Sequence, residues 1–188
     1  AIKEGRVPEE WESEENKHKK AQKDTDARWT KKGNASYYGY KNHVKVDADS
    51  KLIVKSETTS ANVHDSQAIS HLVDESDKVL YADSAYDGNT IAGQLPPTVE
   101  TRIHERAHRG HPLTEQQKAS NREKSKVRVR IEHVFATMTM SFHGLTLRCI
   151  GKARAKFNIA LLNLTYNMYR YESLCRMKDR GVIVAAGF

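Results

Sequence analysis

The chain has 188 residues, enough for one domain with a hydrophobic core and too few for two large domains. It carries 31 Lys and Arg against 24 Asp and Glu, a formal net charge of +7. No apolar run approaches the roughly 18 residues of a membrane-spanning helix, and residues 1–10 lack the apolar core of a signal peptide. The two cysteines, Cys149 and Cys175, have no paired or metal-binding spacing, which favours a reduced, cytoplasmic setting.

Residues 1–32 are mostly charged and predict an exposed helical arm. Pro8 precedes an acidic run (9–15) and a basic run (17–23), the order that the helix dipole favours. From Tyr37 onward the pattern predicts an antiparallel hairpin. Residues 37–46 and 52–54 are rich in β-branched and aromatic side chains, and they flank a turn cluster in which Asp47 is expected to be a turn residue.

Three short elements are expected next. Asp65 should cap a helix that runs to about Glu75. Residues 79–82 predict a buried strand ending at Asp83, and residues 99–104 a last strand. The carboxyl ends of buried strands are where open α/β sheets hold functional groups, although Asp83 could equally be a turn residue or a helix cap.

The stretch from Lys124 to Met140 is the most informative part of the chain. A capping-box pattern at 114–117 should begin a helix that runs through this stretch and ends at Gly144. Arg128 and Glu132 are four residues apart and would share a face. An apolar stripe should pack on the core, formed by Ile131, Val134, Phe135 and Met138. An ordinary amphipathic helix with one ion pair would have the same pattern.

A final helix is expected over about residues 152–174. Its apolar residues recur at helical spacing, so we expect a core helix whose buried face is formed by Ala153, Phe157, Ala160, Leu161, Leu164, Met168 and Tyr171. The positive charge of the chain is concentrated just before and within this region. Residues 101–156 hold thirteen Lys and Arg against four Asp and Glu, a net +9 that suits nucleic acid, or alternatively serves solubility.

Asp83 and Glu132 are the candidate catalytic and metal-binding residues. Carboxylates brought together beside cations form a site for hard divalent ions, usually Mg²⁺ with Mn²⁺ as a substitute, and two such ions can promote phosphodiester cleavage. The nine histidines have no zinc-binding spacing. The cations expected to hold the DNA backbone are Lys124, Lys126, Arg128, Arg130, Lys152 and Arg154. Arg128 is expected to orient Glu132 or to contact a phosphate.

At these residues the chain resembles the transposases of bacterial insertion sequences in the DDE superfamily, in particular the fifth insertion-sequence family. The resemblance covers about residues 22–173, and it implies an RNase H-like fold with Mg²⁺-dependent DNA cleavage and strand transfer. Asp83 matches the second acidic residue of the family and Glu132 the third. The matching motifs are DTDARWTKK (24–32), YYGYKNHVKVD (37–47), ANVHDS (61–66), VLYADSAYDG (79–88), RVRIEHVFA (128–136) and RCIGKARAKFNIALLNLTYNMYR (148–170).

Two departures from the family pattern stand out. Many relatives carry Tyr and Lys around the glutamate, where this chain has Ser125 and Thr139. The strand with the first catalytic Asp would precede residue 1, so the chain looks like the carboxyl-terminal part of a transposase. None of the other aspartates in the matched motifs fits that first position. We read Asp65 as a helix cap, whereas Asp24 and Asp26 have no evident role in the sequence.

The sequence therefore predicts an α/β, RNase H-like domain with a mixed sheet flanked by helices that lacks its first strand. The expected divisions are an arm (1–32), the catalytic domain (33–173) and a tail (174–188). The expected function is a DNA transposase that acts on double-stranded DNA, self-associates, is not bound to a membrane and is associated with the nucleoid. This part alone is expected to be inactive. A non-catalytic DNA-binding remnant and an RNase H-like nuclease without strand transfer are the alternatives.

Overall fold

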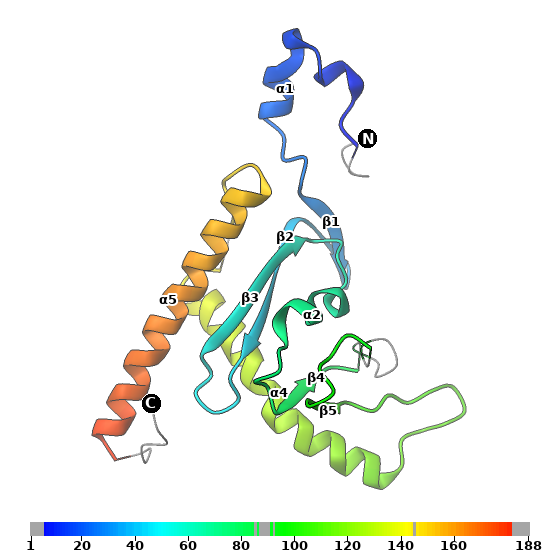
Figure 1. Cartoon of the computed structure of the whole chain (residues 1–188), viewed down its shortest axis with the longest axis vertical. Coiled ribbons are helices and arrows are strands. Elements are labelled where there is room, and N and C mark those ends of the chain that lie inside the picture. Colours follow the sequence, from blue (N-terminus) through cyan, green and yellow to red (C-terminus); the bar gives the residue numbers. More distant parts are fainter. Residues whose placement is uncertain (1–5, 85, 87–90, 92, 145, 182–188) are drawn as a thin grey trace.

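The computed structural model describes residues 6–84, 86, 91, 93–144 and 146–181, and it has a mixed α/β fold (Figure 1). None of the described helices is long and apolar enough to cross a membrane. In chain order the elements are the 3-10 turns η2 (Glu9–Trp11) and η3 (Glu14–Asn16), α1 (Lys17–Ala21), β1 (Arg28–Lys32), β2 (Ala35–Val46), β3 (Ile53–Ser60), η4 (Asp65–Ala68), α2 (Ile69–Leu72), β4 (Val79–Ala82), β5 (Glu100–Ile103), α4 (Glu115–Ser141) and α5 (Lys152–Asp179).

The strands form two separate sheets. β1, β2 and β3 are antiparallel neighbours, and β4 pairs in parallel with β5. The hairpin predicted around Asp47 is confirmed by the antiparallel pairing of β2 with β3. Asp47 is the turn residue expected, since its carboxylate accepts hydrogen bonds from the backbone amides of Asp49 and Ser50 at 3.2 and 2.7 Å. The strands predicted at 79–82 and 99–104 are β4 and β5. β4 is only partly buried, since Val79 is exposed and Ala82 alone of its four residues is buried.

Helix α4 begins as predicted. Thr114 accepts a hydrogen bond from the Gln117 amide, and the Gln117 side chain bonds back to the Thr114 amide, which completes a capping box. Val134 and Met138 are buried against the sheet formed by β2 and β3. The predicted stripe is wrong at Phe135, which is 39% exposed. A second cluster, formed by Ile69, Val73, Ile91 and Val99, lies beneath β4 and β5.

The face that α5 buries is not the one that the apolar spacing predicts. All seven residues expected in the core, Ala153, Phe157, Ala160, Leu161, Leu164, Met168 and Tyr171, are exposed. The helix lies along β3 (Figure 1) and buries Ala155, Ile159, Asn163, Tyr166 and Leu174 instead. The core-helix prediction is therefore correct about the helix and wrong about its orientation.

Hydrogen bonds to the sheet set this orientation. Asn163 bonds reciprocally with Asn42 of β2, at 2.8 and 3.2 Å. Asn167 accepts from the Ile53 amide and donates to the Ile53 carbonyl, both at 2.8 Å. Farther along the same face, Tyr166 and Arg170 donate to backbone carbonyls of the turn between β2 and β3. Buried polar groups are costly unless they are paired, so this set of partners fixes which side of α5 faces the sheet.

Two further predictions differ from the structure. The helical arm is broken into η2, η3 and α1 and ends at Ala21, and residues 28–32 form β1 rather than part of the arm. The helix expected from Asp65 is also shorter, and it ends at Leu72. His64 occupies the N-cap position and accepts the Ser66 amide, whereas the Asp65 carboxylate lies 3.2 Å from the Lys41 ammonium group.

The structure gives Asp24 and Asp26 a role that the sequence did not suggest. Asp24 accepts hydrogen bonds from the Tyr40 hydroxyl at 2.7 Å and from the Gly151 amide at 3.1 Å. Asp26 accepts from the amide of Lys152, the first residue of α5, at 3.0 Å. Carboxylates are favoured at a helix N-terminus, where amides lack intrahelical partners. The two aspartates therefore attach the start of β1 to the start of α5.

Each sheet has an open edge. Residues 35–39 of β2 pair with β1 and residues 40–46 pair with β3, so each residue of β2 has a partner in one strand only within the described residues. β4 pairs only with β5 there. Lys45 of β2 reaches Asp74 and Asp77, which precede β4, at 3.2 and 2.9 Å. Unpaired strand edges invite a further strand.

Replacing Asp24 should destabilise the fold in a pH-dependent way. Burial alone would raise the pKa of Asp24, but hydrogen bonds from Tyr40 and the amides of Gly151, Ala27 and Asp26 together lower it below its ordinary value of 3.8. A lowered folded pKa contributes stability that is present above the unfolded pKa and is lost as pH falls through the folded one. We expect Asp24→Ala to lower the free energy of unfolding at neutral pH by about 1–3 kcal/mol in urea titrations.

The matched variants separate charge from hydrogen bonding. Asp26→Ala should cost about 1 kcal/mol, the usual value of a helix cap. Asp24→Asn keeps an acceptor and removes the titrating group, so its stability should fall less steeply than that of the wild type below pH 4 or so, as the pH passes the ordinary value of 3.8. An Asp24→Ala protein as stable as the wild type at neutral pH would contradict the attachment of β1 to α5 described above.

Candidate active site

The two candidate carboxylates meet at one guanidinium. Asp83 directly follows β4, and Glu132 lies on α4, as expected. Arg128, one turn before Glu132, places its Nη2 atom 2.9 Å from Glu132 Oε1 and its Nη1 atom 4.0 Å from Asp83 Oδ2. Asp83 and Glu132, almost fifty positions apart in the sequence, thus both lie beside the guanidinium group of Arg128. Their side chains are 56% exposed at Asp83, 52% at Glu132 and 33% at Arg128, so the site opens to solvent.

A row of α4 side chains holds the carboxyl ends of both parallel strands. His104, directly after β5, lies between the Ala82 carbonyl of β4 and the Ser125 hydroxyl of α4, at 3.3 and 2.9 Å. Lys124 donates to the Ile103 carbonyl at 2.9 Å. One turn earlier, Asn121 exchanges hydrogen bonds with the backbone of Glu105. These contacts fix where β4 ends relative to Arg128 and Glu132, and so they determine where Asp83 lies.

The backbone after β4 constrains Asp83 further. The Ser84 amide donates to Asp83 Oδ1 at 2.6 Å, and the Tyr86 amide donates to the Asp83 carbonyl at 2.9 Å. Burial, together with the negative charges of Asp65 and Asp83, raises the pKa of Tyr86 to about 12. The Tyr86 hydroxyl therefore remains protonated at physiological pH. Asp83 is therefore a turn residue, which was one of the roles considered for it, and its second carboxylate oxygen lies 4.0 Å from Arg128.

The carboxylates of Asp83 and Glu132 are of the chemical type that binds divalent ions, but two carboxylates are few for such a site. Carboxylate oxygens are the ligands that Mg²⁺ prefers. Within the described residues, no group of three or more His, Cys, Asp and Glu side chains is placed to hold a metal ion. Asp24, Asp26 and Asp47 are bonded to backbone amides elsewhere in the fold. Asp83 and Glu132 can thus supply two ligands, with Arg128 balancing part of their charge.

Three of the six cations expected on DNA are occupied within the protein. Lys124 is bonded to the end of β5, and its side chain is only 17% exposed. Arg128 lies between the two carboxylates. Arg130 donates to the Ala48 carbonyl and lies 3.3 Å from Asp49, which attaches α4 to the turn between β2 and β3. The formal charge of this region therefore overstates the number of free cations.

The other three cations are exposed at two separate places. Lys126, on α4, forms an exposed pair with Glu123 at 2.6 Å. Lys152 and Arg154 are exposed in the first turn of α5, and the described part of the chain shows no ion pair to either side chain. Figure 1 shows this end of α5 near β1, whereas β4 and β5 lie toward the other end of the helix. The structure thus does not gather the six cations into one patch.

His104 and Tyr86 are the residues at this site that the sequence analysis missed. His104 follows the strand predicted at 99–104, and the carboxyl ends of parallel neighbours lie at the same sheet edge. That argument would have placed His104 beside Asp83, but it requires knowing that β4 and β5 are parallel neighbours. Tyr86 lies in the same sequence motif as Asp83. Nothing in the motif indicates that the tyrosine, which is half-buried, packs against the second cluster.

The comparison with known families agrees with this geometry. The family model described as the transposase DDE domain matches residues 11–168, which is most of the chain and includes Asp83, Arg128 and Glu132. The match begins inside the segment expected to be an arm and ends within α5. No solved structure matches the chain. Since one family model covers both carboxylates and nearly all of the described fold, the chain belongs to the transposase DDE domain family of insertion sequences.

Proposed function

We propose that this protein is a DNA transposase that cuts DNA and transfers strands through Asp83 and Glu132. The observation that carries the proposal is the meeting of these two carboxylates, from β4 and α4, at the guanidinium of Arg128. Exposed ion pairs contribute roughly 0–1 kcal/mol to stability, so these three side chains are accessible to a ligand at little cost to the fold. The family membership supplies the reaction class, which is phosphodiester cleavage and joining.

Asp83 and Glu132 are proposed ligands of Mg²⁺, or of Mn²⁺ as its substitute. The family generally uses divalent metal ions, and when bound such an ion activates the attacking oxygen and stabilises the leaving one. Arg128 keeps the two carboxylates oriented while no ion is bound. Because its guanidinium is exposed on one side, it is also placed to contact a DNA phosphate near the reacting bond.

The missing part of the site is proposed to be a strand that carries a further carboxylate. Two exposed carboxylates supply few ligands for Mg²⁺, which binds weakly to such sets. The open edges of β2 and β4 belong to sheets that both contact α4, and Lys45 bridges the two at Asp74 and Asp77. One strand between these edges would join the sheets into the single RNase H-like sheet expected from the family. It would also bring its side chains close to Asp83.

The proposed partner is double-stranded DNA at transposon ends and targets, which would place the protein at the nucleoid. Lys126, Lys152 and Arg154 are the proposed phosphate contacts, since their side chains are exposed. Lys124 and Arg130 donate hydrogen bonds to backbone carbonyls of the protein, so they are not proposed as primary DNA contacts. The 188-residue chain by itself is proposed to bind DNA without cutting it. In that respect it would behave as the non-catalytic DNA-binding remnant considered above.

DNA binding should depend steeply on salt. If about five phosphates are neutralised, the logarithm of the association constant should fall with the logarithm of salt concentration at a slope near −4 to −5 for duplex DNA. The triple variant Lys126→Gln, Lys152→Gln and Arg154→Gln should reduce the slope by about 3 and weaken binding to all sequences alike. Fluorescence anisotropy on two unrelated duplexes measures both quantities.

The control for this measurement removes three exposed cations from another region. Lys19, Lys20 and Lys23 lie outside the basic segment 101–156, and all three are exposed. Changing them to Gln lowers the net charge by the same amount. If both triple variants lose the same affinity, binding follows total charge and the three proposed contacts have no special role. A salt-independent affinity would exclude phosphate contacts altogether.

The purified chain should bind supercoiled plasmid but leave it intact in Mg²⁺. A longer protein that includes an upstream strand with its Asp should nick the plasmid and join ends. In that protein, Asp83→Asn and Glu132→Gln should each abolish both activities. All three side chains at the site are at least one-third exposed. These substitutions should therefore change stability by less than about 1 kcal/mol. Gel assays of nicking, with urea titrations of each variant, test this.

Each other outcome selects one of the alternatives. Nicking by the 188-residue chain that disappears in Asp83→Asn and Glu132→Gln would mean that a third carboxylate already exists within these residues. A longer protein that binds DNA but neither nicks nor joins would indicate a non-catalytic remnant. Nicking without joining of a 3′-hydroxyl end would indicate a nuclease. In all cases Lys19→Gln, an exposed residue outside the proposed DNA contacts, serves as a folded variant with both carboxylates intact.

A further inference from the structure

Helix α5 presents a continuous apolar stripe to solvent. Five large side chains have exposed fractions between 51% and 68%: Phe157, Leu161, Leu164, Met168 and Tyr171. The stripe lies opposite the face that bonds to β2, β3 and their connecting turn, so the described part of the chain does not cover it. Exposed apolar patches of this extent usually mark an interaction surface.

The spacing of these residues identifies the kind of partner. The five positions are separated by four, three, four and three residues, which is the heptad pattern of a coiled-coil seam. The next position in the pattern is Cys175, which is half-buried. None of the six seam positions from Phe157 to Cys175 is occupied by a charged residue. A seam with this period fits a second helix of the same period and does not resemble a nucleic-acid or ligand site.

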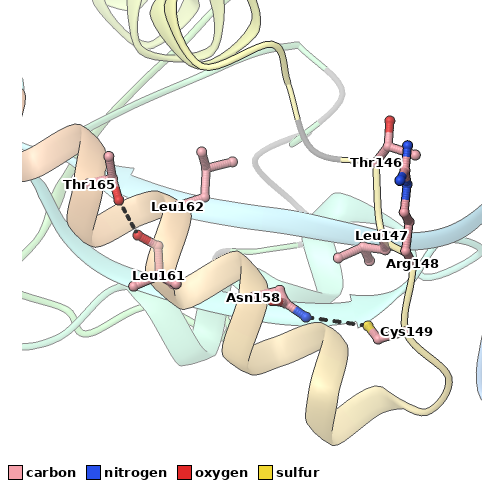
Figure 2. A pocket seen from close by; sticks show the side chains of 8 residues that line it. All are labelled: Thr146, Leu147, Arg148, Cys149, Asn158, Leu161, Leu162 and Thr165. Atoms are coloured by element: carbon pink, nitrogen blue, oxygen red, sulfur yellow. Dashed lines mark hydrogen bonds between the residues drawn. The ribbon is translucent and has the colours of Figure 1, made fainter.

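A groove beside the stripe provides space for a side chain of that second helix. It has a volume of about 470 Å³ and lies between residues 146–149 and the middle of α5 (Figure 2). Leu147, Leu161 and Leu162 supply its apolar lining. Leu161 belongs to both the stripe and the groove. An inserted partner side chain would therefore be packed from two sides, as a knob is in a coiled-coil hole.

We propose that the stripe pairs with the same stripe of a second copy of this chain. A symmetric dimer needs one self-complementary surface, and an uninterrupted apolar seam is self-complementary without further adjustment. Burying five half-exposed large side chains on each copy removes on the order of 1,000 Å² from solvent, the lower range for a specific interface. The helix is already held by the sheet, so pairing does not have to offset the entropy of helix formation.

This inference does not depend on the proposed transposase activity. It rests on the exposure and spacing of α5 residues, none of which touches Asp83 or Glu132. It also differs from association through the open edge of β2 or β4, which would use backbone hydrogen bonds. Substitutions distinguish the two modes of association. A charged side chain introduced into the α5 stripe should disrupt pairing through the stripe and leave the strand edges of β2 and β4 unchanged.

The test is sedimentation velocity of the 188-residue chain without DNA, across a hundredfold range of concentration. The wild type should form dimers, and Leu161→Glu with Leu164→Glu should weaken dimerisation at least tenfold. The control is Met140→Glu, which places one Glu on an exposed apolar residue of α4 outside the stripe; Met140 is 81% exposed. This control should dimerise as the wild type does. Far-ultraviolet circular dichroism and urea titration show that each variant remains folded.

The outcomes are decisive in either direction. Loss of the dimer in the α5 double variant with retention in Met140→Glu supports the proposal. A wild type that remains monomeric at all concentrations overturns it. A dimer that persists in the folded double variant also overturns it, and points to the strand edges instead. DNA cleavage assays are not needed for any of these results.

Discussion

The position of α4 is the constraint on which the other parts of the structure depend. One side of this helix buries Val134 and Met138 against β2 and β3, and a second side holds the ends of β4 and β5 through Lys124 and Ser125. Within the described residues the two sheets do not pair with each other, and they are connected by α4 and by the ion pairs of Lys45 with Asp74 and Asp77. Glu132 lies one turn beyond Arg128 on this helix. The contacts of Lys124 and Ser125 with the strand ends therefore also set the distance between Glu132 and Asp83.

The orientation of α5 shows how hydrogen bonding can decide between two faces of a helix. Its sheet side contains Asn163, Asn167 and Arg170, side chains that seldom occur in a core. Each has a partner on β2, β3 or their turn, so burying them costs little, whereas turning the helix would leave those backbone groups unpaired. The larger apolar side chains are left facing solvent. A helix held in this way can keep an apolar surface exposed without losing its place in the fold.

The sequence predicted those features that depend on local patterns. The capping box at Thr114, the turn at Asp47 and the strand before Asp83 are all encoded within a few residues, and all are confirmed. The buried face of α5 was not predictable from periodicity, because its partners are more than 100 residues away. The attachment of Asp24 and Asp26 to α5 has the same cause. Formal charge is also a poor guide to the DNA-binding surface, since cations such as Lys124 and Arg130 have partners within the fold.

The charge balance at the candidate site bears on how a metal ion would be held there. Two carboxylates and one guanidinium leave a net charge of −1 at Asp83, Glu132 and Arg128, and exposure to water screens it. Under the proposed function, a third carboxylate would raise the net charge to −2, which matches one divalent ion. The repulsion among three carboxylates would then be relieved by the ion rather than by Arg128 alone. Under that proposal, metal binding and the joining of the two sheets would be coupled, because one added strand would supply both backbone partners for the open edges and a further ligand.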